Sequence, residues 1–308
     1  MTGSAFLAQV PSGCRERLTA HYGSAAAPWL DEVPRLLEAA ARQWGLTLTE
    51  FHDAGHASVL AMAADPRGKA VVLKAWFDPE RHQRELAALR LWYSGVRRVV
   101  LASDPAHAVA ALRLVGTAPG GSPPPDDELA QVAKAITALH SAGRRSPGRS
   151  FPLLDGYLAE EVLPRIRRRT ERRTGTRFAD HAADVLPLLG RLPEGPAPRT
   201  VLHADLYREN IAFDVTGKPV LLDPLPMRGD TLFDWAFWCV YYRLGRGAAA
   251  RLRLAGRHSG TAPTLLLPWC LMLALDGLLY YEESGDRRLH TMARLFDALL
   301  EQLRRDQA

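Results

Sequence analysis

Four polar residues in one stretch of the chain have types and spacings suited to chemistry on a hydroxyl group. His203, Asp205 and Asn210 lie within one octet, and Asp223 follows at the end of the apolar run PVLLD. A carboxylate can orient a hydroxyl and accept its proton. Asparagine and aspartate supply the hard oxygen ligands that Mg²⁺ prefers, and Mg²⁺ usually takes only one or two from a protein. The set therefore predicts phosphoryl transfer, with Asp205 as base and with Asn210 and Asp223 as Mg²⁺ ligands.

The octet HADLYREN, residues 203–210, matches the catalytic-loop pattern of protein kinases, H-R-D-L-x-x-x-N, except at Ala204. Asp223 stands where those enzymes have the aspartate of the D-F-G triplet. The triplet here is DPL, and because its Phe and Gly are absent, no switchable activation segment is inferred. Each residue alone is commonplace, because an asparagine after HxD is often a helix cap. The loop and the strand-ending aspartate together favour the functional interpretation.

Phosphoryl transfer also needs a lysine that holds the nucleotide phosphates and a helical glutamate that orients it. Lys74 ends the apolar run AVVLK and is one of only four lysines. Glu85 precedes the apolar face of the next helix, whereas the helix dipole alone explains an acid at Glu80. Gly55 and Ser58 are candidates for nucleotide contacts because they lie two strands before Lys74. The segment DAGHASV that contains them lacks the pattern G-x-G-x-x-G.

The elements that must position these residues form two parts of different character. Helices are expected within 1–48, strands at 46–53, 57–64, 70–77, 97–104 and 108–115, and a helix at 79–95. A Gly/Pro-rich linker covers 116–128. Helices are expected after it at 126–142, 154–172, 178–190, 231–245 and, with breaks, 263–304. In this second part of the chain, IAF and PVLLD are the only strand-like runs. The predicted class is α+β and bilobal: a β-rich nucleotide-binding lobe with a helical N-terminal extension at 1–115, a hinge at 116–125, and a larger helical lobe at 126–308.

Composition favours a cytoplasmic protein of 308 residues with a formal net charge of +5. The three cysteines have no metal-ligand spacing, the N-terminus is a poor signal peptide, and no apolar run approaches the roughly 20 residues of a membrane helix. The basic run RIRRRTERRTGTR, residues 165–177, lacks interleaved aromatic residues and is interpreted as a solvated helix face. We expect no nucleic-acid or membrane partner, and a monomer or weak dimer.

The segment HADLYRENIAF resembles the H-G-D-x-x-x-x-N loop of the aminoglycoside phosphotransferase and choline kinase group, with Ala204 in place of glycine. DPLPMRGDTLFDWA is similar to the D-P-x-G-x-x-G-D-x-x-x-D segment of the streptomycin 6-phosphotransferase and hydroxyurea phosphotransferase subfamily. Asp230 and Asp234 fall at matching places, while Pro226 replaces the first glycine.

This resemblance implies a protein-kinase-like fold that transfers the γ-phosphate of ATP, or GTP, to a hydroxyl of a small molecule with the help of Mg²⁺. It gives Asp205 the role of catalytic base, and His203 and Asp234 the role of holding the catalytic loop. Backbone groups near Arg113 and Val115 would contact the adenine. The same resemblance assigns Asn210 and Asp223 to Mg²⁺, and Lys74 with Glu85 to the phosphates.

The subfamily's substrates include a cationic aminocyclitol antibiotic, which would need acidic residues in the helical lobe. Asp276 is favoured because apolar residues flank it, and Glu282 is the next candidate; Glu283, Glu160 and Glu161 are others, and ordinary surface charge is the alternative for each. A tuberactinomycin peptide, hydroxyurea or another hydroxylated metabolite are alternative acceptors. A non-catalytic nucleotide-binding protein would be expected to have lost a site residue, and a nucleic-acid-binding protein should show affinity that falls steeply with salt.

Overall fold

A computed structural model describes residues 9–55, 57–145, 151–172, 182, 185–188, 192 and 199–307. The chain divides into two compact units, one comprising Met1–Ser122 with Phe213–Val215 and the other Pro123–Ala212 with Thr216–Ala308. The first unit carries a five-stranded sheet and the second is mainly helical, which confirms the predicted α+β class. The domain limits 1–115, 116–125 and 126–308 stay a prediction.

The first unit contains every strand expected between residues 46 and 115. Its elements are α1 (Ser12–Tyr22), α2 (Ala26–Gln43), β1 (Thr47–His52), β2 (Ser58–Ala64), β3 (Ala70–Trp76), α3 (Pro79–Trp92), β4 (Val100–Asp104) and β5 (Val109–Arg113). The strand order is β1-β2-β3-β5-β4, and all neighbours are antiparallel. Asp78 begins α3 by accepting hydrogen bonds from the backbone of Glu80 and Arg81, as an N-cap aspartate does.

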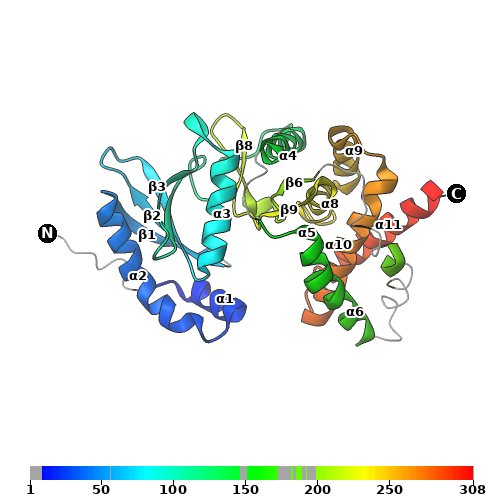
Figure 1. Cartoon of the computed structure of the whole chain (residues 1–308), viewed down its shortest axis with the longest axis horizontal. Coiled ribbons are helices and arrows are strands. Elements are labelled where there is room, and N and C mark those ends of the chain that lie inside the picture. The colour runs from blue at the N-terminus through cyan, green and yellow to red at the C-terminus, as the bar shows by residue number, and fades with distance from the viewer. Residues whose placement is uncertain are drawn as a thin grey trace. The chain divides into compact units, whose positions relative to one another are not determined.

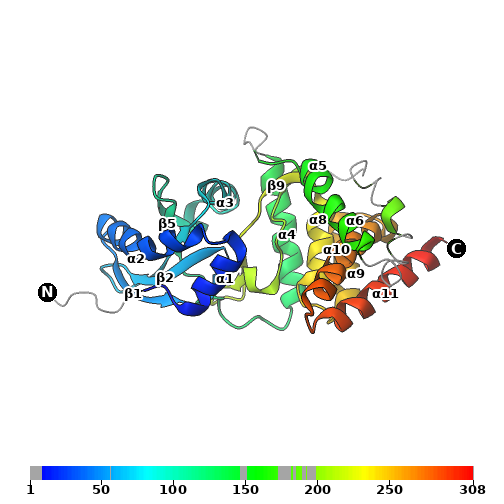
Figure 2. The same cartoon turned by 90° about the horizontal axis from the view of Figure 1, so that it is seen from below.

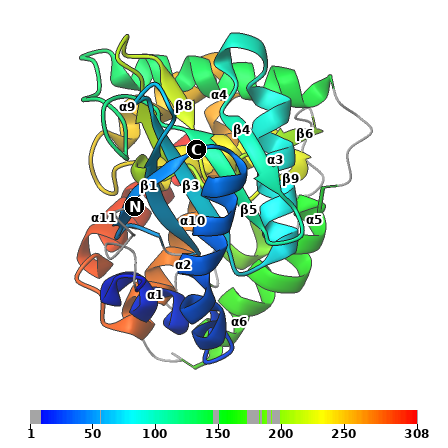
Figure 3. The ribbon, with the colours of Figure 1, turned by 90° about the vertical axis from the view of Figure 1, so that its left-hand side faces the viewer.

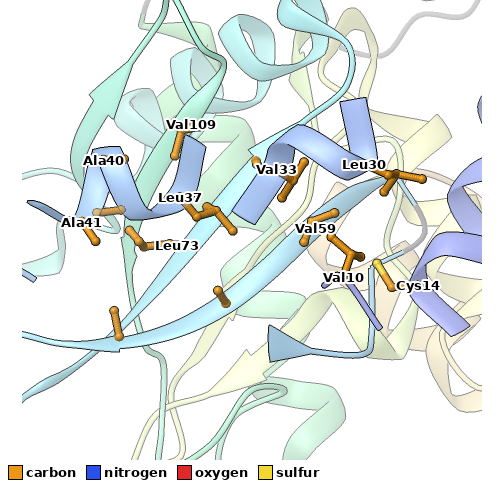
Figure 4. Packing of buried hydrophobic residues seen from close by; sticks show 14 of the residues in the cluster. Val10, Cys14, Leu30, Val33, Leu37, Ala40, Ala41, Val59, Leu73 and Val109 are labelled. Carbon is orange, nitrogen blue, oxygen red and sulfur yellow. The ribbon is translucent and has the colours of Figure 1, made fainter. Parts of the chain in front are cut away.

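The two faces of this sheet have different partners because side chains alternate along a strand. Odd-numbered residues of β2 and β3, such as Ala61 and Leu73, pack in one core with Leu30 and Leu37 of α2 (Figure 4). Even-numbered residues such as Lys74 face the opposite side, where α3 lies (Figures 1 and 3). The spacing of apolar residues in α2 thus covers one face and leaves the other for polar chemistry.

The second unit is built around helices. Its elements are α4 (Glu128–Arg144), α5 (Leu154–Tyr157), a π-helical turn (Leu158–Val162), α6 (Leu163–Glu171), β6 (Arg199–Leu202), a 3₁₀ turn (Arg208–Asn210), β7 (Ile211–Phe213), β8 (Pro219–Leu221), β9 (Met227–Asp230), α8 (Thr231–Tyr241), α9 (Ala248–Ser259), α10 (Pro263–Ser284) and α11 (Leu289–Gln307). The helix expected at 178–190 falls largely outside the described residues. The β7–β8 pair confirms the strands predicted from IAF and PVLLD.

Two strands and one helix escaped the sequence prediction. β6 and β9 pair with each other in antiparallel register, Thr200 opposite Gly229, although each has only four residues. So short a strand has no periodicity of its own and exists because of its distant partner. Gly229 is needed in this pair because a Cβ there would lie 2.4 Å from Cβ of Leu154. The unpredicted helix is α9.

Helix α10 corrects the expectation that no segment is long and apolar enough to cross a membrane. It passes that test by length and composition, but 72% of its apolar window is buried inside the protein. Figure 2 shows α10 among α6, α8, α9 and α11. The core helix of a globular protein passes the same test, so its apolarity is explained by packing.

Candidate active site

The loop that follows β6 is fixed to α8 by the fully buried carboxylate of Asp234. Its Oδ2 accepts a hydrogen bond from the backbone N–H of His203 at 2.9 Å, and its Oδ1 accepts one from Ala204 at 2.8 Å. The ring Nε2 of His140, on α4, lies 2.9 Å from Oδ2. One carboxylate therefore fixes the backbone immediately before Asp205, which is the place where a residue holding the catalytic loop must act.

Ala204 and Asp223 adopt the left-handed backbone conformation, with φ values of 59° and 55°. This conformation costs a residue with a Cβ about 1–2 kcal/mol, and glycine avoids the cost. Ala204 replaces the glycine of the similar loops, so this backbone strain is present at the residue whose N–H donates a hydrogen bond to Asp234. Strain of this kind is found where a site demands one backbone geometry.

Asn210 is fixed directly against Asp205. Its Nδ2 donates to the backbone oxygen and to Oδ2 of Asp205, both at 2.8 Å. The N–H of Leu222 donates to the carbonyl of Asn210 at 2.7 Å, so the β7–β8 hairpin brings the residue before Asp223 next to Asn210. The amide nitrogen of Asn210 is used by Asp205, so Oδ1 is the oxygen that the side chain could offer to a metal ion.

The donors at this position suit Mg²⁺, since they are an amide oxygen and a carboxylate. Within the described part of the chain, no group of three or more His, Cys, Asp or Glu side chains could hold a metal ion. A site with Asn210 and Asp223 as its only protein ligands is compatible with Mg²⁺, which commonly keeps water and phosphate oxygens as its other ligands.

His203 lies inside the protein beneath this loop. Its carbonyl accepts a hydrogen bond from the N–H of Leu225 at 2.9 Å, and its side chain is fully buried. Burial lowers the pKa of His203 to about 4, although the nearby charge of Asp234 opposes this shift. The ring is therefore neutral near pH 7.

In the first unit, Lys74 and Glu85 form a buried ion pair. The Lys74 Nζ donates to Glu85 Oε1 at 2.7 Å, and the two side chains are 3% and 0% exposed. The indole of Trp76 donates to the other oxygen of Glu85 at 2.8 Å, and its ring centroid lies 4.8 Å from Nζ. Glu80 instead pairs with Arg84 and is 80% exposed. Of the two glutamates, it is therefore Glu85 that pairs with Lys74 in the structure.

The remaining nucleotide candidates differ in what their side chains can do. Gly55 makes so tight a turn that a Cβ would lie 1.8 Å from the carbonyl oxygen of Ser58, which is itself buried. The guanidinium of Arg113 donates to the carbonyls of Val96 and Arg97 at 3.4 and 3.3 Å. Any contact of Arg113 with an adenine ring would therefore use its backbone, and Val115 is buried.

The acids expected to bind a cationic acceptor have protein partners. Asp276 accepts hydrogen bonds from Arg165 at 3.0 and 2.7 Å and from Arg169 at 3.0 Å. Arg169 also donates to Glu283 at 2.9 Å. Arg165 and Arg169 thus pair with carboxylates on α10, whereas Arg167 and Arg168 are exposed, so the prediction of a solvated face holds for only part of the described run; residues 173–177 lie outside the described residues. Glu282 is half-buried on α10.

The other two candidates for the acceptor, Glu160 and Glu161, are exposed on the π-helical turn, as expected for surface charge.

Sequence reasoning missed Trp76, which contacts Glu85 in the first unit, and His140 and Glu128, which contact the loop and α8 in the second. Glu128, at the start of α4, accepts hydrogen bonds from the hydroxyl of Tyr242 and from Arg243, and lies 3.3 Å from Nε of Arg208. It connects the end of the catalytic loop to the end of α8. No local signal identifies such residues, because their partners are distant in the sequence.

Comparison with known proteins agrees with this geometry. Residues 96–267, more than half of the chain, match the phosphotransferase enzyme family. The streptomycin 6-kinase of Streptomyces griseus is 26% identical over 227 residues, which cover 73% of this chain and 72% of that protein. The streptomycin 6-kinase of Streptomyces glaucescens is 25% identical over 231 residues, covering 74% and 73%.

A solved aminoglycoside phosphotransferase, in a ternary complex with ADP and hygromycin B, has a similar fold. Its TM-score is 0.58 at 16% sequence identity, and the alignment covers 86% of this chain and 97% of that chain. At this identity the likeness concerns the fold alone, and it confirms the kinase-like fold predicted from the sequence.

Proposed function

We propose that this chain, which belongs to the phosphotransferase enzyme family, transfers the γ-phosphate of ATP to a hydroxyl group of a small molecule, with a streptomycin-type aminoglycoside as the first acceptor. A phosphotransferase acting on an alcohol group follows from the family; the donor, the metal and the acceptor are our proposal. The proposal rests on the geometry of one loop, in which Asn210 donates a hydrogen bond to Asp205 and Asp234 accepts hydrogen bonds from the backbone just before Asp205.

In the proposed reaction, Asp205 accepts the proton of the acceptor hydroxyl as its oxygen attacks the γ-phosphorus. The bond from that phosphorus to the bridging oxygen breaks, and ADP leaves with the electron pair. General-base catalysis of this kind contributes a factor of roughly 10²–10⁴. Asn210 and Asp223 would hold Mg²⁺, which supplies neutralisation of the phosphate charge. Lys74, oriented by Glu85, would bind the α- and β-phosphates.

The choice of acceptor is supported by the two streptomycin 6-kinases and not by the residues first considered for it. Asp276 already accepts three hydrogen bonds from two arginines, so a cationic acceptor that used it would have to displace one of them. A tuberactinomycin peptide, hydroxyurea and other hydroxylated metabolites therefore belong in the same assay.

The test is a measurement of ADP formation by the full chain with ATP and Mg²⁺, with each acceptor tried separately. We expect streptomycin to stimulate ADP release and to gain the mass of one phosphoryl group, and the Asp205→Ala variant to do neither. A product from another acceptor alone would replace streptomycin in the proposal. Absence of any phosphorylated product, with ATP hydrolysis equal in wild type and variant, would reject it.

A further inference from the structure

We infer that helix α1 positions the connection between β1 and β2 for binding the nucleotide phosphates, through the side chains of Arg17 and Tyr22. The β1–β2 connection is defined here as residues 53–55 and 57, and it includes Gly55. The inference rests on the proposed function, because it assigns positioning residues to its nucleotide site.

Helix α1 has a fixed place in the first unit. Cys14 and Leu18 are both fully buried in the core that α2 shares with the sheet, and Figure 4 shows Cys14 beside Val10 and Val59. Tyr22 continues the same row of residues at a spacing of four. Its ring lies 4.9 Å from that of Phe77. One row of α1 residues therefore fixes the helix to the core, and its polar groups lie on the remaining surface.

Three hydrogen bonds join α1 to the β1–β2 connection. Arg17 donates through Nε to the carbonyl of Gly55 at 3.1 Å and through its terminal nitrogen to Asp53 Oδ1 at 2.5 Å. The hydroxyl of Tyr22 donates to the carbonyl of Ala57 at 3.1 Å. Helix α1 thus donates hydrogen bonds to residues at both ends of the β1–β2 connection.

Gly13 of α1 also lies against the side chain of Asp53. A Cβ at this position would lie 2.7 Å from the carboxylate of Asp53. Gly13 and Arg17, one helical turn apart, are thus the residues of α1 that face Asp53.

The β1–β2 connection leads into the part of the sheet that holds Lys74. Ser58, the first residue of β2, pairs with Trp76, and Leu60 pairs with Lys74. Burial raises the pKa of Tyr22, and the charge of Arg81 on α3 acts in the opposite direction. A lysine and a glycine-containing turn at one end of a sheet are the groups that hold nucleotide phosphates in kinases.

The physical consequence concerns the order of the connection before nucleotide binds. If its binding-competent conformation is populated for only a fraction of the time, the apparent dissociation constant rises by the inverse of that fraction. The hydrogen bonds from Arg17 and Tyr22 raise this fraction. The effect should be confined to ligands that carry phosphates.

The experiment is calorimetric titration of the full chain with two probes, ATP in the presence of Mg²⁺ and adenosine. The variants are Arg17→Met, which keeps the aliphatic stem, and Tyr22→Phe, which keeps the packing on Phe77. Arg15→Met is the matched control, because Arg15 lies on the same helix and pairs with Asp31 of α2 instead. We expect Tyr22→Phe, which removes one hydrogen bond, to weaken ATP binding about fivefold, Arg17→Met, which removes two, to weaken it more, and both to leave adenosine binding unchanged.

The outcomes separate this inference from the proposed function. A wild-type chain that binds neither ATP nor GTP would reject the proposed function and the inference with it. Wild-type binding of ATP with unchanged affinity in both test variants would overturn the inference alone. Equal loss of ATP and adenosine binding would also overturn it, by showing general disruption. If Arg17→Met does not fold, Tyr22→Phe, which removes a single oxygen atom, decides the result.

Discussion

Replacement of Asp234 by asparagine tests whether the catalytic loop depends on one buried carboxylate. Asp234 accepts hydrogen bonds from two backbone N–H groups and contacts Nε2 of His140. An asparagine has the same shape but only one acceptor oxygen, so its NH₂ group must face the N–H of His203 or of Ala204. A hydrogen bond to a charged acceptor contributes about 1.5–3 kcal/mol, and an unsatisfied buried donor costs about 1–3 kcal/mol.

The total of about 3–5 kcal/mol should divide between stability and turnover. The hydrogen bond from the N–H of Ala204 to Asp234 helps to maintain the left-handed backbone conformation of Ala204. If the backbone of Ala204 relaxed from this conformation, the next residue, Asp205, would be displaced. A loss of about 2.7 kcal/mol of transition-state stabilisation lowers kcat roughly 100-fold. We expect this fall in kcat in the ADP-release assay, with ATP affinity unchanged, and lower resistance to urea.

Asp230→Asn is the matched control for this experiment. Asp230 begins the same helix by accepting a hydrogen bond from the N–H of Leu232, and asparagine serves equally well at that position. The control should keep kcat within about twofold of wild type. An Asp234→Asn variant that also kept wild-type kcat and stability would refute the assignment of the loop geometry to Asp234.

Three further predictions concern the base, the ion pair and pH. Asp205→Ala should abolish phosphoryl transfer and leave ATP binding largely intact; near-wild-type turnover would remove Asp205 from the role of base. Glu85→Gln should remove the charge of the carboxylate that pairs with buried Lys74 and lower the free energy of unfolding in urea by about 3–5 kcal/mol, and a variant as stable as wild type would contradict this. Burial lowers the pKa of His82 below 6.5 and that of His203 to about 4, so below pH 6.5 the unfolded chain binds protons first and stability should fall with falling pH. The His82→Phe variant should show a shallower slope of unfolding free energy against pH in this range. A slope identical to that of wild type would show that His82 does not contribute to the pH dependence of stability.

The sequence alone identified the parts of the site that are close together along the chain. The loop from His203 to Asn210 and the hairpin that ends at Asp223 are local, so residue types, spacing and apolar runs define them. Lys74 was found in the same way, since a lysine that directly follows an apolar, strand-like run is readable from its own residues. The five-stranded sheet and most helices follow from the same periodicities.

The tertiary structure decided which distant groups neutralise and orient these residues. His140 and Asp234 are 94 residues apart, and Arg165 and Asp276 are 111 apart. Such pairs form because folding brings buried donors and carboxylates together, where each must be satisfied, and no local pattern encodes the partner. The sequence determined that the chain has an aspartate fit to accept a proton. Only the packing of α8 beneath the loop decided how that aspartate is held, and only α10 decided that Asp276 is paired with arginine.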